Sequence, residues 1–288
     1  MGLEEKAIAR YKMASELSFQ ITGMPLVVCY SGGKDSDVLL HLVQRAGIPF
    51  EALHNHTTAD APQTVYHIRE TFHRLECAGI KCTVEMPTYK GMPTTMWDLI
   101  PQKLMPPTRL ARYCCETLKE RGGAGRMIAT GVRWAESAAR KKRGALEVNH
   151  HDRKKSLILM NDNDEARQVF ETCTMKGKRI INPIIEWETA DILNYCESFH
   201  LPMNPLYSMG FCRVGCVGCP MASNARKMEF QMFPTYRAAY IRSFDRMLES
   251  RRIRNLPTDW QTGADVFHWW MEDGVMTGQM WLPGTEDV

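Results

Sequence analysis

The stretch Pro25–Ser36, PLVVCYSGGKDS, decides how this chain folds. A short apolar run precedes the segment Ser31–Ser36, and apolar residues at helical spacing follow from Val38 onward. This order predicts a strand, a phosphate-binding loop and a helix. The two glycines let the loop turn its N–H groups toward an anion, and the helix directs its positive N-terminus to the same place. The spacing is not G-x-x-x-x-G-K-[ST], which disfavours an NTPase that cleaves a γ-phosphate. A glycine-rich turn without a ligand is the alternative.

Composition places the chain among ordinary globular proteins. Its 288 residues, 44% of them hydrophobic, can bury a full core without disulfides. No run of eighteen apolar residues occurs, and Glu4, Glu5 and Lys6 stand where a signal peptide needs an apolar core. We therefore expect a soluble, cytoplasmic protein whose ten cysteines serve as thiols, as metal ligands or in redox chemistry, and not in disulfides. The net charge of +3 is too small to decide a partner.

Strand patterns alternate with helical patterns along the first two thirds of the chain. This alternation predicts an α/β fold with a parallel twisted sheet flanked by helices, which binds ligands at the carboxyl ends of its strands. Asp60 is expected to cap a helix that has Pro62 early and Gln63 at the capping-box position. The other expected elements are strands at 26–28, 50–55, 80–86 and 127–130, an edge strand at 179–181, and helices at 3–21, 94–104, 161–174, 187–199, 234–254 and 259–271.

The domain organisation follows from these elements. We expect an N-terminal helix in residues 1–24, a nucleotide-binding domain in 25–205, and a cysteine-rich loop with a helical C-terminal extension in 206–288. The apolar face of the first helix must pack on the domain or on another subunit, and we expect a homo-oligomer.

A second group of basic residues follows the strand expected at 127–130. Arg133 and Arg140 suit a phosphate clamp, because guanidinium groups grip phosphate oxygens bidentately. The alternative is a solvated basic turn. The basic run continues to Lys155 and could close over a nucleotide or touch nucleic acid, although such runs are usually solvated.

Five cysteines form a pattern typical of a metal centre. Cys114 and Cys115 are adjacent, and Cys212, Cys216 and Cys219 follow about a hundred residues later in a glycine-rich stretch. Thiolates from two such loops could hold zinc or a [4Fe-4S] cluster. Structural zinc sites usually use two C-x-x-C pairs, so the adjacent pair favours the cluster, with zinc as the alternative.

Several motifs in a fixed order resemble one known family. SGGKDS, RYCCETLK, GVRWAES, NPI, NPLY and GFCRVGCVGCP occur in the order seen in the phosphoadenosine phosphosulfate (PAPS) reductase-like family of the PP-loop ATP pyrophosphatases. The resemblance covers roughly residues 25–245. It is closest to bacterial and phage members with cluster cysteines, and it extends to the ATP pyrophosphatase subunit of DNA phosphorothioation systems. It implies an adenine nucleotide α-hydrolase-like fold.

The resemblance also implies roles for particular residues. It makes Lys34, Asp35 and Arg133 catalytic, and places Mg²⁺ with ATP at the loop. The nucleotide would contact Ser31, Gly32, Gly33, Lys34, Asp35, Ser36, Gly131, Arg133, Glu136, Ser137 and Arg140. A [4Fe-4S] cluster would have the ligands Cys114, Cys115, Cys216 and Cys219, with Cys212 as an extra thiol or a substitute ligand.

Two enzymatic functions and one binding function are compatible with this family. Sulfonucleotide reductases use a cysteine near the C-terminus as nucleophile, and no cysteine follows Cys219 in this sequence. We therefore expect ATP-dependent activation, with release of AMP and pyrophosphate, and sulfur transfer to tRNA or DNA, supplied by a donor such as a cysteine desulfurase. The alternatives are reduction of PAPS or adenylyl sulfate with a thioredoxin-like donor, and a cluster-bearing nucleotide sensor.

Arginines between 226 and 254 could hold nucleic acid, whereas the aromatic residues among them have the spacing of a buried helix face.

Overall fold

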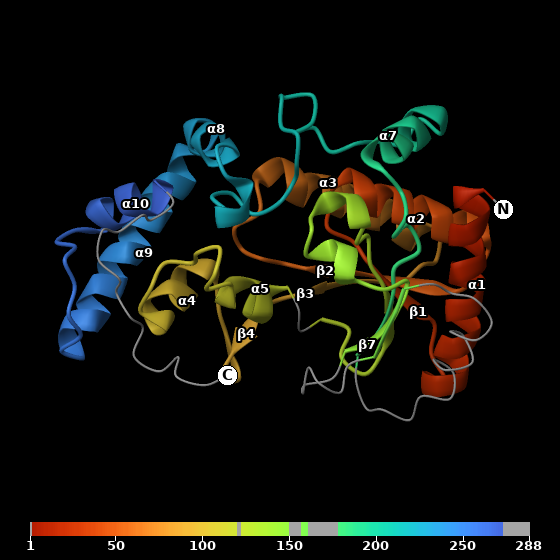
Figure 1. The fold of residues 1–288 in the computed structure, drawn as a ribbon, viewed down its shortest axis with the longest axis horizontal. Helices are drawn as coiled ribbons and strands as arrows, with labels where there is room; N and C mark the ends of the chain where they lie inside the picture. The colour runs from red at the N-terminus through yellow and green to blue at the C-terminus, as the bar shows by residue number, and fades with distance from the viewer. Residues whose placement is uncertain (1, 120–121, 150–156, 161–177, 273–288) are drawn as a thin grey trace. The chain divides into compact units, whose positions relative to one another are not determined.

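The fold comes from a computed structural model that describes residues 2–119, 122–149, 157–160 and 178–272. Its internal contacts divide the chain into two compact units. Of the described residues, those within 2–56, 60–87 and 119–215 belong to the larger unit, and those within 57–59, 88–118 and 216–272 belong to the smaller unit. Figure 1 traces the elements of both along the chain.

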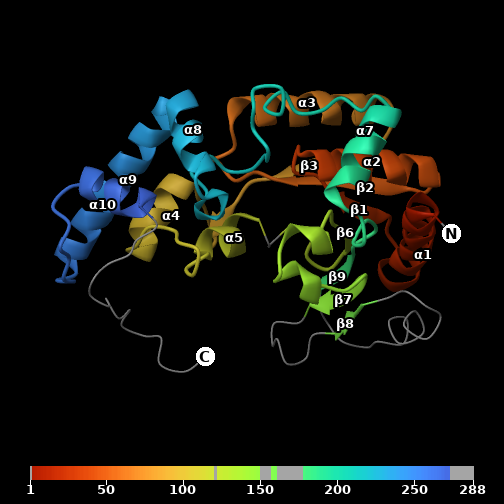
Figure 2. The ribbon, with the colours of Figure 1, turned by 45° about the horizontal axis from the view of Figure 1, so that its top comes forward.

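The larger unit is built on a seven-stranded, mostly parallel sheet. Five strands pair in parallel in the order β3-β2-β1-β6-β9, and β7 and β8 continue the sheet antiparallel to β9 (Figure 2). This architecture confirms the predicted fold class. The strands are β1 (Leu26–Cys29), β2 (Phe50–Asn55), β3 (Cys82–Glu85), β6 (Met127–Ala129), β7 (Leu146–Asn149), β8 (Leu157–Leu159) and β9 (Lys178–Ile181).

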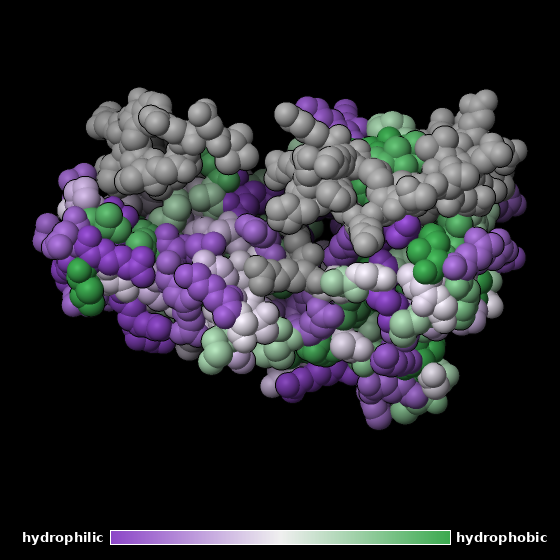
Figure 3. Space-filling model, turned by 90° about the horizontal axis from the view of Figure 1, so that it is seen from below, coloured by the Kyte–Doolittle hydropathy of each residue, from purple (hydrophilic) through white to green (hydrophobic). Residues whose placement is uncertain are grey.

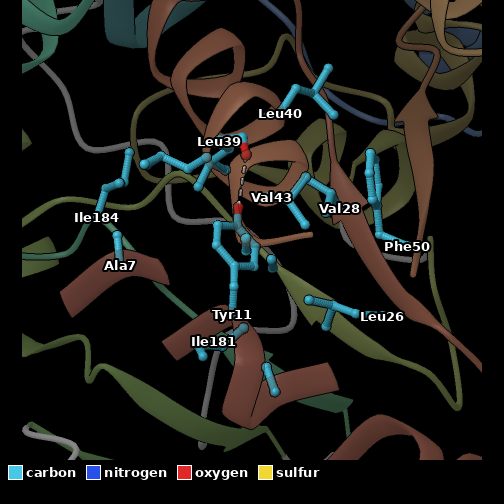
Figure 4. Close-up of a cluster of buried hydrophobic side chains, with 14 of the residues drawn as sticks. Ala7, Tyr11, Leu26, Val28, Leu39, Leu40, Val43, Phe50, Ile181 and Ile184 are labelled. Atoms are coloured by element: carbon cyan, nitrogen blue, oxygen red, sulfur yellow. Dashed lines mark hydrogen bonds between the residues drawn. The ribbon is translucent and has the colours of Figure 1, made fainter. Parts of the chain in front are cut away.

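Helices cover this sheet because each presents one apolar face to it. Helix α2 packs against α1 and α7, and its residues Leu39 and Val43 are fully buried. In the core, the hydroxyl of Tyr11 donates a 3.1 Å hydrogen bond to the carbonyl of Leu39 (Figure 4). This bond gives a partner to the hydroxyl of Tyr11, which is the only polar group of that buried side chain. The helices of this unit are α1 (Leu3–Thr22), α2 (Lys34–Ala46), α3 (Pro62–Cys77) and α7 (Thr189–Ser198), with 3-10 turns at Trp134–Glu136 and Arg140–Lys142.

The smaller unit is mainly helical and has an aromatic core. Helix α9 packs against α4 and α10, and the ring of Tyr240 lies 4.9 Å from that of Trp97 and 4.7 Å from that of Trp270, centroid to centroid. Phe230, Tyr240 and Phe244 of α8 and α9 are buried, as the spacing of the aromatic residues in this stretch predicts. The elements are β4 (Thr88–Tyr89), β5 (Met92–Pro93), α4 (Met96–Lys103), α5 (Tyr113–Leu118), a 3-10 turn (Pro220–Ala222), α8 (Ala225–Met232), α9 (Pro234–Ile253) and α10 (Gly263–Met271).

Two local predictions are wrong. Strand β9 is not at an edge, because the unpredicted hairpin of β7 and β8 extends the sheet beyond it. Asp60 does not cap α3: Ala61 is the N-cap residue, and Pro62 at the first helical position has no N–H that needs a partner. The helix expected at 161–174 lies outside the described residues.

The surface in Figure 3 mixes hydrophilic residues with smaller hydrophobic groups on the part of that face formed by described residues. None of the helices in the described ranges combines the length and the apolar character that a membrane span requires.

Candidate nucleotide and metal sites

The predicted phosphate loop lies between β1 and α2, at the carboxyl edge of the parallel strands. Gly32 has a φ of +73°, and a Cβ there would come within 2.9 Å of the Ile68 side chain, so the loop needs glycine at this position. The Ser36 hydroxyl accepts hydrogen bonds from the N–H groups of Ser31 (3.2 Å) and Gly33 (3.1 Å) and lies 2.7 Å from the Gly33 carbonyl. These bonds fold the loop around the first turn of α2.

Two residues that the sequence analysis did not assign to the site hold the loop from outside. The buried side chain of Asn204 donates to the carbonyl of Gly32 at 2.8 Å. The hydroxyl of Tyr207 accepts a 3.1 Å hydrogen bond from the N–H of Lys34, and burial raises the pKa of this hydroxyl to about 12. Both residues belong to the motif NPLY, which the sequence analysis noted without giving it a role. Only the folded structure shows that this motif contacts the phosphate loop.

Three charged side chains at the loop contact one another in series: Lys34, Asp35 and Arg133. The ammonium of Lys34 lies 3.0 Å from one carboxylate oxygen of Asp35, and Nε of Arg133 donates to the other at 2.5 Å. Arg133 is only 2% exposed and also donates to the carbonyl of Trp187 at 3.1 Å. Gly131 is close to these three side chains, since a Cβ on it would lie 3.5 Å from the Cβ of Asp35. Arg133, expected to clamp phosphate, is thus directed at Asp35 in this structure.

The remaining predicted nucleotide residues form a second group. The Glu136 carboxylate accepts from the N–H of Arg133 at 3.0 Å and pairs with the side chain of Arg140. The hydroxyl of Ser137 accepts from the N–H of Arg140 at 3.2 Å. The structure therefore connects this group to the phosphate loop through Arg133.

The four predicted metal ligands all belong to the smaller unit. Cys114 and Cys115 lie on α5, and Cys216 and Cys219 flank the turn before Pro220. A hydrogen bond to Cys115, burial, and the nearby thiol groups of Cys115, Cys216 and Cys219 together raise the pKa of the Cys114 thiol. The charges of Cys115, Cys216 and Cys219 therefore act on Cys114. Cys212 is exposed and belongs to the larger unit.

The surroundings of these cysteines suit a bound metal group. Cys216 is 6% exposed, and its sulfur lies 3.4 Å from the hydroxyl of Thr57. Gly218 has a φ of +75°, and its N–H donates to the Glu229 carboxylate at 2.7 Å, which shapes the turn between the two cysteines. Thiol groups are the ligands of both a Cys₄ zinc ion and a [4Fe-4S] cluster. Among the described residues, no three of these sulfur atoms lie within 4.8 Å of one another, which is a wider spacing than the ligands of a single zinc ion have.

Two other features lie outside the candidate site. Arg226, one of the arginines considered for nucleic acid, is 1% exposed and donates to the carbonyl of Trp270 at 2.8 Å, so it is a structural residue. A pocket of about 490 Å³ lies at the amino edge of the sheet, near Pro25, Phe50 and Lys81, and is therefore at the opposite end of the strands from the phosphate loop.

The fold and the loop define the class of protein. A mostly parallel sheet whose first strand leads through an SGGKDS loop into a helix N-terminus is a PP-loop fold of the adenine nucleotide α-hydrolase-like type. The sequence model described as "Phosphoadenosine phosphosulfate reductase domain" matches residues 25–222. The chain belongs to the phosphoadenosine phosphosulfate reductase family.

Individual relatives are distant. The chain is 26% identical over 113 residues to an adenosine 5'-phosphosulfate reductase of Burkholderia cepacia, covering 39% of this chain and 38% of that protein. It is 26% identical over 188 residues to sulfate adenylyltransferase subunit 2 of Agrobacterium fabrum, covering 63% of this chain and 56% of that protein. The chain thus spans about half or less of the length of these relatives.

Among solved structures, two similar chains have low overall similarity. The PAPS reductase of Candida auris has a TM-score of 0.44 and 16% identity over 70% of this chain and 87% of that one. The U34-tRNA thiolase NcsA of Methanococcus maripaludis, solved with its [4Fe-4S] cluster, has a TM-score of 0.41 and 14% identity over 94% of this chain and 91% of that one.

Proposed function

We propose that this chain is an enzyme that binds ATP at Ser31–Ser36, activates an oxygen of a nucleic-acid acceptor by adenylation, and replaces that oxygen with sulfur. The observation that carries the proposal is the presence of two chemical centres in one chain: a phosphate loop backed by Lys34 and Asp35, and four neighbouring cysteines. The sulfate adenylyltransferase relative, by its name, also transfers an adenylyl group.

The adenylation step needs stabilisation of phosphate charge. An acceptor oxygen attacks the α-phosphorus of ATP, the bond to the β-phosphate bridge breaks, and pyrophosphate leaves. The N-terminus of α2 and the ammonium of Lys34 provide positive charge for these oxygens, with Mg²⁺ accompanying the nucleotide. Arg133 acts through Asp35, which it holds in place beside Lys34.

The second step exchanges oxygen for sulfur. A sulfide-level donor attacks the activated carbon, the carbon–sulfur bond forms, and AMP leaves with the oxygen. Cys114, Cys115, Cys216 and Cys219 would hold a [4Fe-4S] cluster, which would supply a redox-active group. Because four thiolates would complete the coordination of all four irons, the sulfide attacks directly from the donor and not from an iron of the cluster. The acceptor is tRNA or DNA, and a cysteine desulfurase is a suitable source of sulfur.

Reduction of a sulfonucleotide is the second candidate. The family description and the adenosine 5'-phosphosulfate reductase relative favour it. In that reaction a thiolate attacks the sulfur of PAPS or adenylyl sulfate, the sulfur–oxygen bond to the phosphate breaks, and the adenosine nucleotide leaves. A thioredoxin-like dithiol then releases sulfite from the resulting S-sulfonate and is itself oxidised to a disulfide.

Product analysis separates the two candidates. Anaerobically purified protein is incubated with Mg-ATP and sulfide, with or without total tRNA or plasmid DNA, and separately with PAPS or adenylyl sulfate and dithiol. We expect AMP and pyrophosphate from ATP in an acceptor-dependent manner, and thiolated nucleosides by mass spectrometry. Lys34→Met should abolish both, whereas Lys81→Met, which removes an exposed lysine of the same unit, should not. Sulfite from PAPS without AMP from ATP would establish the reductase instead.

A further inference from the structure

Two histidines and an aspartate, residue types that commonly ligate metal ions, lie at the carboxyl end of β2, apart from the cysteines in sequence. His54 is the penultimate residue of β2 and His56 directly follows the strand. Residues two apart in an extended chain point to the same side, and the N–H of His56 still pairs with the carbonyl of Glu85 at 2.9 Å. One ligand atom from each of His54, His56 and Asp60 lies within 4.8 Å of the other two.

His54 is fixed in the form that a metal ligand needs. Its Nδ1 lies 2.9 Å from the carbonyl oxygen of Tyr30, which can only accept a hydrogen bond, so Nδ1 carries the proton. Nε2 is then left with its lone pair. The ring is 5% exposed and cannot easily turn. An imidazole that donates its other N–H to a backbone carbonyl is the usual arrangement of a histidine ligand.

The spacing between His56 and Asp60 suits an ion better than a direct bond. Nδ1 of His56 and Oδ2 of Asp60 are 3.9 Å apart, which is too long for a hydrogen bond. Two nitrogen or oxygen ligands bound about 2.1 Å from one ion lie about 3.0 to 4.2 Å apart. Asp60 is 7% exposed, so its carboxylate approaches the two rings from a buried position.

We propose that His54, His56 and Asp60 bind one divalent transition metal ion, Zn²⁺ or Fe²⁺, at a site separate from the four cysteines. Two imidazoles and one carboxylate suit these ions, whereas Mg²⁺ prefers oxygen ligands alone. Three protein ligands leave coordination positions open to water or to a bound anion. Tyr30, whose carbonyl orients His54, directly precedes Ser31, so this site adjoins the phosphate loop. The inference stands independently of the sulfur-transfer proposal.

Co²⁺ is the probe for this site, because its absorption reveals its ligands. Tag-free full-length protein is titrated anaerobically with Co²⁺, and d–d bands that appear without thiolate-to-cobalt charge transfer are assigned to nitrogen and oxygen ligands. We expect the wild type to bind one equivalent of Co²⁺ with these thiolate-free bands. His56→Ala and Asp60→Asn should weaken it by a factor of ~100 or more. His73→Ala, which removes an exposed histidine of α3, should leave it unchanged.

A stability readout guards against misfolded variants. Zn²⁺ should raise the unfolding temperature of the wild type and of His73→Ala, because an ion that binds only the folded state stabilises it. Asp60→Asn and the more conservative His56→Asn should show a smaller Zn²⁺-dependent rise in unfolding temperature, because they lack the contribution of the thiolate-free site. Equal thiolate-free Co²⁺ binding by the wild type and the His56 and Asp60 variants would overturn the proposal. So would cobalt bound only with thiolate charge transfer.

Discussion

Arg133 shows how one buried side chain can control a loop that it does not belong to. Its guanidinium is removed from water and satisfied by the Asp35 carboxylate and the Trp187 carbonyl. Asp35 in turn lies beside the ammonium of Lys34. Because a buried charge is costly without a partner, the three positions are coupled, and Lys34 depends on a residue 99 positions later in the chain.

Arg133→Met is therefore expected to lower the free energy of unfolding and to weaken ATP binding. Breaking a buried ion pair by removing one partner costs about 3–5 kcal/mol, and the 21% exposure of Asp35 places this pair at the lower end, about 3 kcal/mol. Urea unfolding and nucleotide titration measure the two effects. Arg252→Met is the control, since that side chain is 55% exposed. An equal, small loss in both variants would show that the Asp35 pair contributes little.

The turn from Cys216 to Cys219 is the element on which the proposed metal centre would depend most directly. It combines the left-handed backbone of Gly218 with close packing, because a Cβ on Gly218 would lie 2.5 Å from the ring of Phe230 and 2.9 Å from that of Tyr240. The hydroxyl of Tyr240 also donates to the carbonyl of Val217 at 2.9 Å. The aromatic core of the smaller unit thus determines the path of the turn.

Gly218→Ala should reduce both stability and metal content. The matched control is Gly79→Ala, which has a similar φ of +79° but no atom within 4 Å of the new Cβ. The control should lose about 1–2 kcal/mol from backbone strain alone. Gly218→Ala should lose more and bind less iron per chain, because the new methyl group displaces the rings that hold the turn. Iron analysis and thermal unfolding give both values, and equal iron content in the two variants would contradict this account.

The elements differ in how far local sequence predicts them. Strand β1, the phosphate loop and α2 follow from the sequence because glycine placement, apolar spacing and a helix start agree there. Strand β9 was assigned to an edge because the basic stretch before it obscured the hairpin of β7 and β8. Asp60 has the residue type of an N-cap, yet it lies near the His56 ring, and Pro62 sets the start of α3 instead. Neither Asn204 nor Tyr207 could be assigned, since their contacts with the loop exist only in the folded chain.

On the scale of the whole molecule, the two centres belong to different compact units. The phosphate loop and the His54 group are in the larger unit, and the four neighbouring cysteines are in the smaller one. Each unit has its own core, aliphatic around α2 and aromatic around α9. Local stability can therefore respond to a ligand in one unit without an equal response in the other.

Removal of the metal should test this separation. Because binding energy at a structural metal site is also folding energy, an iron chelator should increase hydrogen exchange at residues 113–118 and 216–222. Exchange in β1 and β6 should stay the same, since their core includes none of Cys114, Cys115, Cys216 and Cys219. Mass spectrometry of peptides from the treated and untreated protein measures the difference. A uniform increase over both units would show that the metal stabilises the molecule globally.

The contacts of Asn204 and Tyr207 with the phosphate loop also have a consequence for protein synthesis. These residues lie 172 and 173 positions beyond their loop partners Gly32 and Lys34. At about 5–20 residues per second, a ribosome reaches them roughly 9 to 35 s after it has made the loop. During this interval the nascent chain already contains β1 and α2 but lacks the two side chains that fix the loop between them. If the loop binds a nucleotide as proposed, this binding should be acquired late in translation, long after residues 31–36 have left the ribosome.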